Sequence, residues 1–412
     1  MQTQLADFVR GTTAGMEAEA ILRKCVHCGF CTATCPTYQL LGDELDSPRG
    51  RIYLIKGVLE GAPVTGQTQQ HLDRCLTCRA CETTCPSGVE YGRLVDIGRA
   101  LVEQRVPRGL FDRLRRAVLA TVLPNQPLFS ALLSVARVLR GVLPQALQQK
   151  ISPAVTNAGV WPAPRHARRM LVLDGCVQPV LAPQINAAAA RVLDRIGISL
   201  IAAPNAGCCG GVRFHLNAQE DGRDQMRALI DAWWPLIEQG AEAIVMTASG
   251  CGVTVREYGH LLADDPRYAE KAQRVSAMTR DLAEVLADQS AAIARKLSAT
   301  PHERIAFHAP CTLQHGQRIR GVVEALLIQA GCEVLPVRDS HLCCGSAGTY
   351  ALLQPALATQ LRDHKLSALQ AQQPAYIATA NIGCLGHLQS GTQTPVKHWI
   401  ELLDVRMIDQ HQ

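Results

Sequence analysis

Two runs of cysteines near the N-terminus repeat one spacing, C-x2-C-x2-C-x3-C-P, in CVHCGFCTATCP and CLTCRACETTCP. Three thiolates at this spacing, wrapped round a loop, can hold three corners of a cube of iron and sulfide. In the two-cluster arrangement the last Cys of each run ligates the other run's cluster. The sequence therefore predicts two [4Fe-4S] clusters, one held by Cys25, Cys28, Cys31 and Cys85 and the other by Cys35, Cys75, Cys78 and Cys81.

The residues between and after these cysteines fit the same prediction. Gly29 lets the backbone approach an inorganic core closely, and Pro36 and Pro86 turn the chain away from it. Zinc is the alternative, but structural zinc sites use pairs of C-x2-C, which leaves the middle Cys and the C-P ending unexplained. So many thiols at metal spacing also indicate a reducing compartment rather than a disulfide framework.

Length and composition indicate a globular protein of two or three domains. The chain has 412 residues, 47% of them hydrophobic, which is ample for packed cores. No apolar run reaches the roughly 18 residues of a membrane span, and the N-terminal MQTQLADFVR lacks the apolar segment of a signal peptide. We therefore expect a cytoplasmic location.

The net charge of +5 is concentrated in one segment. Residues 105–150 hold eight Lys and Arg against the single acidic residue Asp112. This segment has few aromatic residues and no common recognition motif, so nucleic acid is not an expected partner. Its two apolar-periodic stretches predict amphipathic helices, which could contact an anionic membrane surface or simply pack on the rest of the protein.

The elements that must position the thiols form two kinds of domain. Residues 1–104 are predicted to be a mainly helical ferredoxin domain, with a helix over 1–24, a helix capped by Ser47 and begun by Pro48, and a last helix from Tyr91 to Gln104. Residues 105–168 form a helical connector and a linker marked by Pro144, Pro153, Pro162 and Pro164. From residue 169 onward, β-like runs alternate with helical patterns, which predicts parallel strands joined by crossover helices.

A second set of cysteines shows that the α/β region is a repeat, with halves at 169–299 and 300–412. In each half a Cys precedes a C-C-G by 32 positions, and a last Cys follows the final predicted strand. Thiols at the carboxyl ends of parallel strands lie where open α/β sheets place ligand sites. These candidate metal ligands or redox thiols are Cys176, Cys208, Cys209 and Cys251 in the first half and Cys311, Cys343, Cys344 and Cys384 in the second.

This pattern resembles the CCG family of cysteine-rich domains, whose repeat is a Cys, then C-C-G, then C-x2-C. The predicted fold is thus an α-helical ferredoxin module followed by an α/β domain of two similar CCG halves, and the resemblance implies an additional iron–sulfur or zinc centre in the latter. The chain departs from the family pattern because Thr254 and His387 stand where the second Cys of each C-x2-C is expected. His387 is therefore a further candidate ligand.

A narrower resemblance covers almost the entire chain. The stretches ILRKCVHCGFCTATCPTYQLLGDELDSPRGRIYLIKGVLEG and HLDRCLTCRACETTCPSGVEYGRLVDIGR, with the two CCG halves, look like the iron–sulfur subunits of bacterial glycolate oxidases. The resemblance implies partner subunits that contain FAD and oxidise glycolate to glyoxylate, while this chain passes electrons toward a quinone or another membrane acceptor at the inner face of the cytoplasmic membrane.

The residues themselves agree with a division of labour between subunits. A cluster passes one electron, whereas alcohol oxidation releases two electrons and a proton, usually to a flavin or nicotinamide. No G-x-G-x-x-G follows a predicted strand, so we expect the substrate site on the partners and no catalytic residue here. The alternative functions are a thiol–disulfide enzyme of the heterodisulfide reductase kind, which would use the CCG thiols, and a redox sensor, which would need an output domain.

Overall fold

The N-terminal part of the chain is a helical domain, as predicted. The computed structural model describes residues 1–142, 157–298 and 302–407. The predicted helix over 1–24 begins only at Thr13, because Gly11 adopts a positive φ of 74° and the side chain of Thr12 caps the helix by accepting from the Gly15 amide. The helices of this domain are α1 (Thr13–Lys24), α2 (Pro36–Leu41), α3 (Pro48–Leu59), α4 (Gly66–Asp73), α5 (Ala80–Thr84) and α6 (Tyr91–Glu103).

Helices α3 and α6 pack closely beside the two cysteine loops, of which one lies between α1 and α2 and the other between α4 and α6. The predicted start of α3 is confirmed, since the Ser47 side chain accepts from the Gly50 amide and Pro48 opens the helix. At the crossing with α6, a Cβ on Gly98 would lie 2.6 Å from Cγ1 of Ile55. Glycine at position 98 therefore allows the two helices to approach this closely.

The basic segment forms a bent helical hairpin of α7 (Leu110–Val122) and α8 (Gln126–Val138). Among the described residues no single helix is long and apolar enough to cross a membrane, although α7 and α8 pass that test of length and composition together, with a bend of 110° between them. The linker prolines Pro144 and Pro153 lie outside the described residues.

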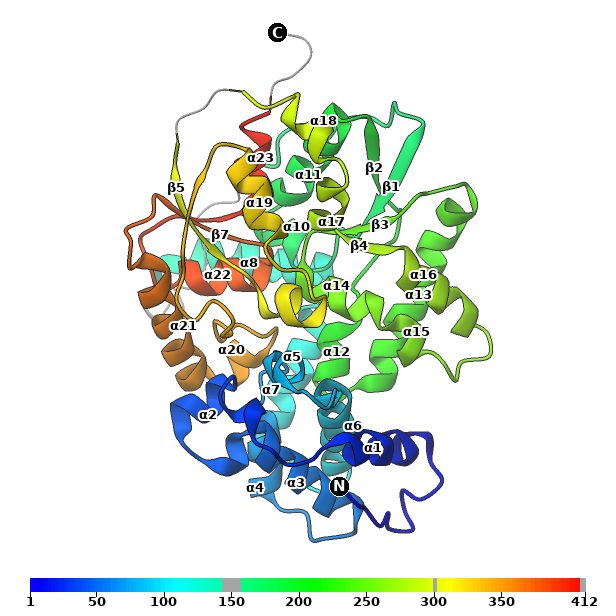
Figure 1. Ribbon diagram of the computed structural model, residues 1–412. Coiled ribbons are helices and arrows are strands. Elements are labelled where there is room, and N and C mark those ends of the chain that lie inside the picture. The colour runs from blue at the N-terminus through cyan, green and yellow to red at the C-terminus, as the bar shows by residue number, and fades with distance from the viewer. Residues whose placement is uncertain (143–156, 299–301, 408–412) are drawn as a thin grey trace.

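The rest of the chain consists of two similar α/β halves, which confirms the predicted fold class (Figure 1). Each half has a four-stranded parallel sheet, ordered β2-β1-β3-β4 in the first and β6-β5-β7-β8 in the second. The strands are β1 (Arg168–Val172), β2 (Ile198–Ala202), β3 (Ile244–Met246), β4 (Thr279–Asp281), β5 (Arg304–His308), β6 (Glu333–Leu335), β7 (Tyr376–Thr379) and β8 (Val396–His398).

Helices cover both sheets, and several of them pack between the two halves. One apolar core contains residues of both sheets, including Val172, Ile305 and Ile400. Ion pairs from Arg191 and Arg195 to Asp404 join the halves at the rim of this core. The helices are α10 (Gln178–Leu181), α11 (Gln184–Arg195), α12 (Gly211–His215), α13 (Gln219–Glu238), α14 (Ser249–Arg256), α15 (Tyr258–Leu261), α16 (Ala269–Met278), α17 (Leu282–Ala287), α18 (Ser290–Ala294), α19 (Val322–Gln329), α20 (Tyr350–Leu353), α21 (Pro355–Gln370), α22 (Ile382–Gln389) and α23 (Trp399–Asp404).

The helical domain sits against both α/β halves, at the bottom of Figure 1. Arg79 of its second cysteine loop pairs with Glu257 of the first half. Thr83 of α5 contacts the second half, with its hydroxyl 2.8 Å from Nδ1 of His315. The two cysteine sets, which are far apart in the sequence, are therefore brought to one interface.

Candidate iron–sulfur and metal sites

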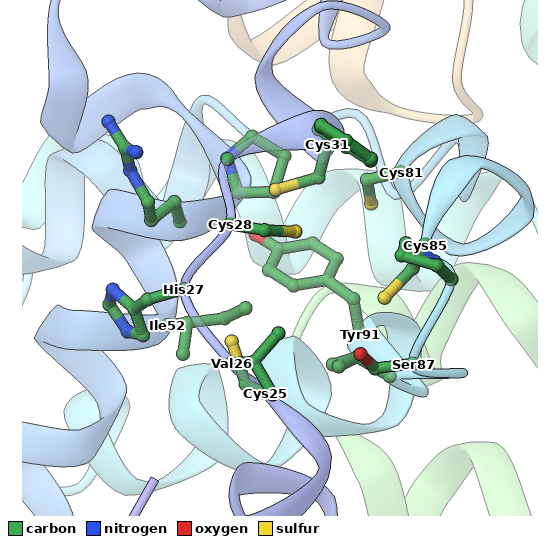
Figure 2. Close-up of a pocket in the computed structure, with 16 residues that line it drawn as sticks. Cys25, Val26, His27, Cys28, Cys31, Ile52, Cys81, Cys85, Ser87 and Tyr91 are labelled. Atoms are coloured by element: carbon green, nitrogen blue, oxygen red, sulfur yellow. The ribbon is translucent and has the colours of Figure 1, made fainter.

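The first predicted cluster site is a pocket lined by all four of its predicted ligands. Cys25, Cys28, Cys31 and Cys85 surround it, and Figure 2 shows their sulfur atoms around a common space. The first three come from the loop after α1, and Cys85 ends helix α5. The ligand exchange predicted between the two runs is therefore geometrically available.

The second predicted site is a neighbouring pocket that Cys35, Cys75, Cys78 and Cys81 line together. Cys81 also lines the first pocket, so the two sites adjoin. The chain thus presents two adjacent sets of four thiols, and all-thiolate sets of four are the ligands that [4Fe-4S] clusters take. The donor set fits the predicted cofactor at both sites.

The two cysteine loops have the same backbone geometry. In each run the residues two and four positions after the first Cys have positive φ, at His27 (58°) and Gly29 (83°) in one and at Thr77 (51°) and Arg79 (60°) in the other. Left-handed residues turn the backbone so that successive N–H groups and side-chain sulfurs face one concave side. Three of the four positions are not Gly, so the surrounding structure imposes this conformation.

Burial disfavours a charged thiolate at several of these ligands while they are free. It raises the pKa of the Cys31 thiol to about 11, with the neighbouring Cys25 adding to the effect. The pKa values of Cys78 and Cys81 are raised well above the ordinary value, also chiefly by burial. Because metals bind the thiolate, loading these sites releases protons and depends on pH.

Polar groups surround the sulfur atoms of the second site. The Thr77 amide lies 3.4 Å from Sγ of Cys75, and the hydroxyl of Tyr91 lies 3.6 Å from the same sulfur. The hydroxyl of Thr37 lies 3.3 Å from Sγ of Cys35. Hydrogen bonds to cluster sulfurs raise a cluster's reduction potential, so these groups are positioned to tune it.

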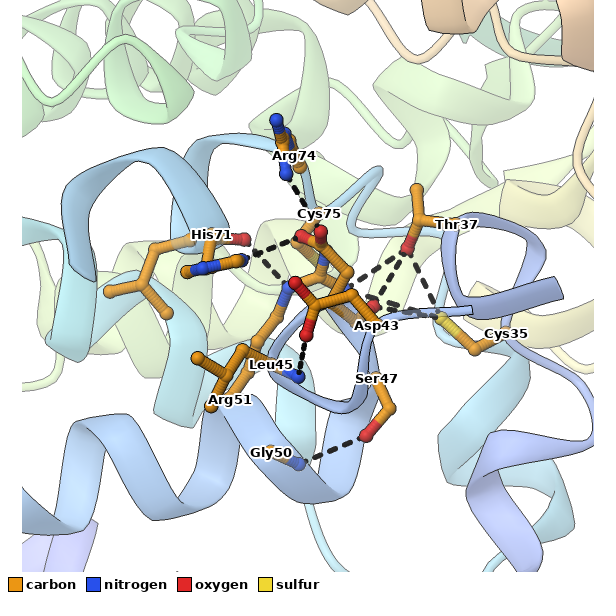
Figure 3. A network of polar contacts seen from close by, with 12 residues as sticks. Cys35, Thr37, Asp43, Leu45, Ser47, Gly50, Arg51, His71, Arg74 and Cys75 are labelled. Atoms are coloured by element: carbon orange, nitrogen blue, oxygen red, sulfur yellow. Dashed lines mark hydrogen bonds and ion pairs between the residues drawn. The ribbon is translucent and has the colours of Figure 1, made fainter. Parts of the chain in front are cut away.

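A buried arginine supplies the strongest charge near the second site. Arg51 is 1% exposed, and its guanidinium reaches to 4.0 Å from Sγ of Cys35 while donating to the hydroxyl of Thr37 and the carbonyl of His71. Its carboxylate partner is the fully buried Asp46 at 3.1 Å, which Arg74 also binds at 2.8 Å. Figure 3 shows Arg51, Arg74 and Thr37 in this network, near Cys35. Two guanidinium groups share one carboxylate here, which leaves a net positive charge beside the cysteines.

The first CCG half brings its four thiols together at one end of its sheet. Cys176 follows β1, Cys208 and Cys209 lie in the loop before α12, and Cys251 is in α14. Cys176 and Cys208 interact, and Cys209 interacts with Cys208 and Cys251. Contacts between these thiols and burial raise the pKa values of Cys176 and Cys209. The predicted thiol cluster of this half exists in the fold.

The second CCG half also gathers its thiols, in a continuous series of contacts from Cys311 through Cys343 and Cys344 to Cys384. Sγ of Cys311 lies 3.7 Å from Sγ of Cys343, and both residues belong to an apolar cluster that includes Cys78 of the second ferredoxin site. Cys344 and Cys384 lie deeper, beside His308, with the three ligand atoms within 4.8 Å of one another. The Cys311 end of this series therefore faces the helical domain, and the Cys384 end lies inside the half.

His387, the further candidate ligand, and the isolated Cys332 make other contacts. Nε2 of His387 lies 3.1 Å from the carbonyl oxygen of Ala358, in the helix that covers the site. Cys332, which stands alone in the sequence, is 5% exposed within the core shared by the two halves. Cys332 is thus an ordinary core residue.

Two polar residues buried beside these thiols, Arg51 and His308, were not predicted as parts of the sites. Each occupies a position where an amphipathic helix or a strand directs side chains inward, and each is 4% exposed or less. The available signal is a polar or charged residue on the apolar face of its element, since such residues are rarely buried without a partner. Periodicity alone does not identify these residues, because the apolar residues around them dominate the pattern.

Comparison with known proteins agrees with this architecture. Residues 21–89 match the family described as "4Fe-4S dicluster domain", and residues 170–256 and 305–389 match the "Cysteine-rich domain" family called CCG. The chain is 57% identical over 404 residues to the glycolate oxidase iron–sulfur subunit of Escherichia coli, covering 98% of both chains. It is 29% identical to the probable glycolate oxidase iron–sulfur subunit of Bacillus subtilis, over 91% of this chain and 90% of that one.

More distant similarity extends to other proteins. The chain is 25% identical over 240 residues to lactate utilization protein A of Geobacillus kaustophilus, which covers 56% of this chain and 96% of the relative. A crystal structure of a hypothetical protein from Helicobacter pylori has the same fold, with a TM-score of 0.56 and 10% identity, over 98% of this chain and 74% of that one.

Proposed function

This chain belongs to the family of glycolate oxidase iron–sulfur subunits, and on that premise we propose that it carries electrons from FAD-containing partner subunits toward a quinone or another membrane acceptor. The partners would oxidise glycolate to glyoxylate. The observation that carries this proposal is the pair of adjoining four-thiol pockets in the helical domain. A [4Fe-4S] cluster in each pocket would accept and release one electron at a time.

In this proposal the protein's own residues fix the positions of the clusters and influence how readily each accepts an electron. Cys25, Cys28, Cys31 and Cys85 hold one cluster, and Cys35, Cys75, Cys78 and Cys81 hold the other. The positive charge of Arg51 stabilises added negative charge at the second site. The apolar contact from Cys78 to Cys311 and Cys343 places the thiols of the second CCG half next to that site, as the next position in the route.

The substrate-oxidising site is assigned to partner subunits because this sequence holds no dinucleotide fingerprint and its buried ligand sets are thiols. Hydride abstraction from a hydroxyacid needs a two-electron acceptor such as a flavin. A thiol–disulfide enzyme remains the competing function, and the 3.7 Å approach of the Cys311 and Cys343 sulfurs is the observation in its favour.

Membrane association is proposed through the α7–α8 hairpin. Large apolar side chains are exposed there, among them Leu110 (82% exposed), Phe111 (77%) and Val138 (85%). By contrast, Arg115 donates to the carbonyl of Leu352, so it faces its own protein. The hairpin would therefore enter the lipid interface chiefly through apolar side chains, at the inner face of the cytoplasmic membrane.

The electron-transfer proposal is tested on the complex purified from native membranes through a tag on this chain. We expect flavoproteins to co-purify, about eight iron atoms per chain for two clusters, and bleaching of cluster absorbance on anaerobic addition of glycolate. The variant Cys78→Ser should abolish glycolate-dependent reduction of a quinone analogue, whereas the core variant Cys332→Ser should retain it. Heterodisulfide reduction by the purified chain, with no flavoprotein bound, would instead establish the competing function.

The membrane proposal is tested by flotation of the full chain with vesicles that contain anionic phospholipid. The double variant Leu110→Glu/Val138→Glu should remain in the dense fraction, because charge on the apolar face opposes insertion. Val160, which is 77% exposed outside the hairpin, provides the matched control Val160→Glu, which should float like the unaltered protein. Equal flotation of the double variant and the control would refute the hairpin as the contact.

A further inference from the structure

The first ferredoxin site reaches the surface of the protein, whereas the second does not. Of the eight ferredoxin cysteines, all of which lie in the described part of the chain, Cys28 alone is exposed. Three ligands of the second site are buried, and the fourth, Cys78, packs against the apolar cluster of Cys311 and Cys343 in the second CCG half. The two sites therefore differ in what can approach them from outside.

Apolar side chains surround the exposed cysteine. Val26 and Phe30 belong to the same loop and line the same pocket as Cys28, yet Val26 is 69% exposed and Phe30 is 61% exposed. Figure 2 shows Val26, His27 and Cys28 following one another along this loop. Tyr53 of α3 is 60% exposed, and its ring meets the ring of His27 edge-on, with the two centroids 5.0 Å apart. We call the surface formed by Val26, Phe30 and Tyr53 the Cys28 surface.

The fold of the helical domain does not account for this surface. Helix α3 contributes Ile52 and Ile55 to the core, while Tyr53 between them is turned to solvent. Grouped apolar side chains at the surface are typical of sites that bind another protein. The centre of such interfaces is enriched in Tyr and Phe and depleted of charged residues. The composition of the Cys28 surface fits a protein partner.

The charges beside the Cys28 surface are neutralised within the chain. Each of the three cations nearest the loop has a carboxylate partner within 2.7 Å: Arg23 with Glu19, Lys24 with Glu90, and Arg49 with Glu44. Net positive charge is what attracts a strongly acidic partner or an anionic membrane. The Cys28 surface instead complements an apolar face of another protein.

We propose that the Cys28 surface is the docking site of the FAD-containing partner subunit. The inference rests on the proposed function and deepens it, because it states where electrons enter this chain. Electrons pass between proteins only over short distances, so the donor must lie beside a ligand that reaches the surface, and Cys28 is that ligand. The second site faces the thiols of the second CCG half, so an electron that enters at the first site has its next position on the inward side.

The electrons balance across this contact. Oxidation of one hydroxyacid by the partner leaves two electrons on its flavin. These cross one at a time, and each reduces the first site by one electron before it moves to the second. The protons of the reaction are released on the partner, so no proton has to cross the Cys28 surface.

The test uses the complex purified from native membranes through a tag on this chain, with FAD and iron measured per chain. Phe30→Glu/Tyr53→Glu should lower the retained FAD by about tenfold or more, because two carboxylates would be buried in an apolar contact. The matched control Ile328→Glu changes a residue of similar exposure, 57%, in α19 of the second CCG half, and it should retain FAD. Tyr53→Glu alone lies outside the cysteine loop, so it should lower the retained FAD while keeping about eight iron atoms per chain.

A photoactivatable residue in place of Phe30 identifies the occupant directly. Illumination should link this chain to the FAD-containing subunit, whereas the same residue in place of Ile328 should give no such link. A link to a second copy of this chain would overturn the inference and leave the electron-transfer proposal standing. The same holds if the double variant retains FAD at the level of the control, or if it loses only its flotation with vesicles. Absence of FAD from the complex of the unaltered chain would refute the proposed function, and this inference with it.

Discussion

Replacing Arg51 by Gln should lower the reduction potential of the second cluster while leaving the first nearly unchanged. The guanidinium is buried beside Cys35 and is fixed by Thr37, Asp46 and the carbonyl of His71. Glutamine keeps a hydrogen-bond donor but removes the charge. Asp46 would remain paired with Arg74, so the substitution removes one net positive charge from the neighbourhood rather than exposing a new negative one.

The size of the effect follows from the distance. Nη1 of Arg51 lies 4.0 Å from Sγ of Cys35. Two unit charges about 4 Å apart interact by about 4 kcal/mol at an effective dielectric constant of about 20. An added electron spreads over the whole cluster, so its mean distance is about twice as long and the interaction about 2 kcal/mol. For a one-electron couple about 59 mV corresponds to 1.36 kcal/mol, which gives a downward shift of about 90 mV.

The assay is an anaerobic redox titration of the full chain followed by electron paramagnetic resonance. One of the two midpoints should move in Arg51→Gln, and Arg51→Lys should hold it near the original value because the charge remains. Arg49, close to Gly29 of the first site, is the matched control: its side chain is 38% exposed, so Arg49→Gln should shift the other midpoint much less. A shift below about 30 mV in Arg51→Gln, about a threefold change in the equilibrium constant, would refute the electrostatic reasoning.

Three stability predictions test the scaffold around the sites. Burial lowers the pKa of His398 to about 4, below its ordinary value of about 6.5. The neutral imidazole therefore contributes fully to the free energy of unfolding above about pH 6.5. That contribution decreases by about 1 kcal/mol between pH 7 and 5.5. His398→Asn should therefore flatten the change in melting temperature over that range. Ser47→Ala should destabilise by about 1 kcal/mol through loss of the cap on the Gly50 amide, measured by thermal melting against Ser134→Ala on the exposed face of α8. Gly98→Ala should cost about 1–3 kcal/mol because the new methyl overlaps Ile55, and an unchanged melting temperature would show that α3 and α6 separate easily.

Much of the fold could be predicted from the sequence because local and repeated signals agree. Alternating β-like and helical runs predicted the two parallel sheets, and the paired cysteine spacings predicted the repeat. Strands β4 (TRD) and β8 (VKH) were not predicted, because three residues with a charged centre have too little β character to stand out. They become strands because the preceding strands of each sheet offer them a pairing edge.

The sets of cysteines that lie together were predictable from their spacing. The polar and charged side chains beside those cysteines were not. Metal ligands recur at fixed intervals, so a linear pattern identifies them. Arg51 acts on Cys35 through a helix packed beside the cysteine loop, and His308 reaches Cys344 from a separate strand. Such contacts depend on tertiary packing and leave no periodic trace in the chain.

The contacts of the basic hairpin bear on how it would meet a membrane in the proposed function. Arginine-rich amphipathic helices suggest electrostatic attraction to anionic lipid. Here Arg108 and Arg116 bind Asp73 of the helical domain, and Arg213 of the first CCG half donates to the Ala120 carbonyl of α7. These arginines thus hold the hairpin against the protein, while large apolar side chains such as Leu110 and Phe111 are exposed, together with Arg113. Vesicle binding through this face should consequently persist in 0.5 M salt, at which the Debye length falls to about 4 Å, whereas attraction through surface arginines would be largely screened.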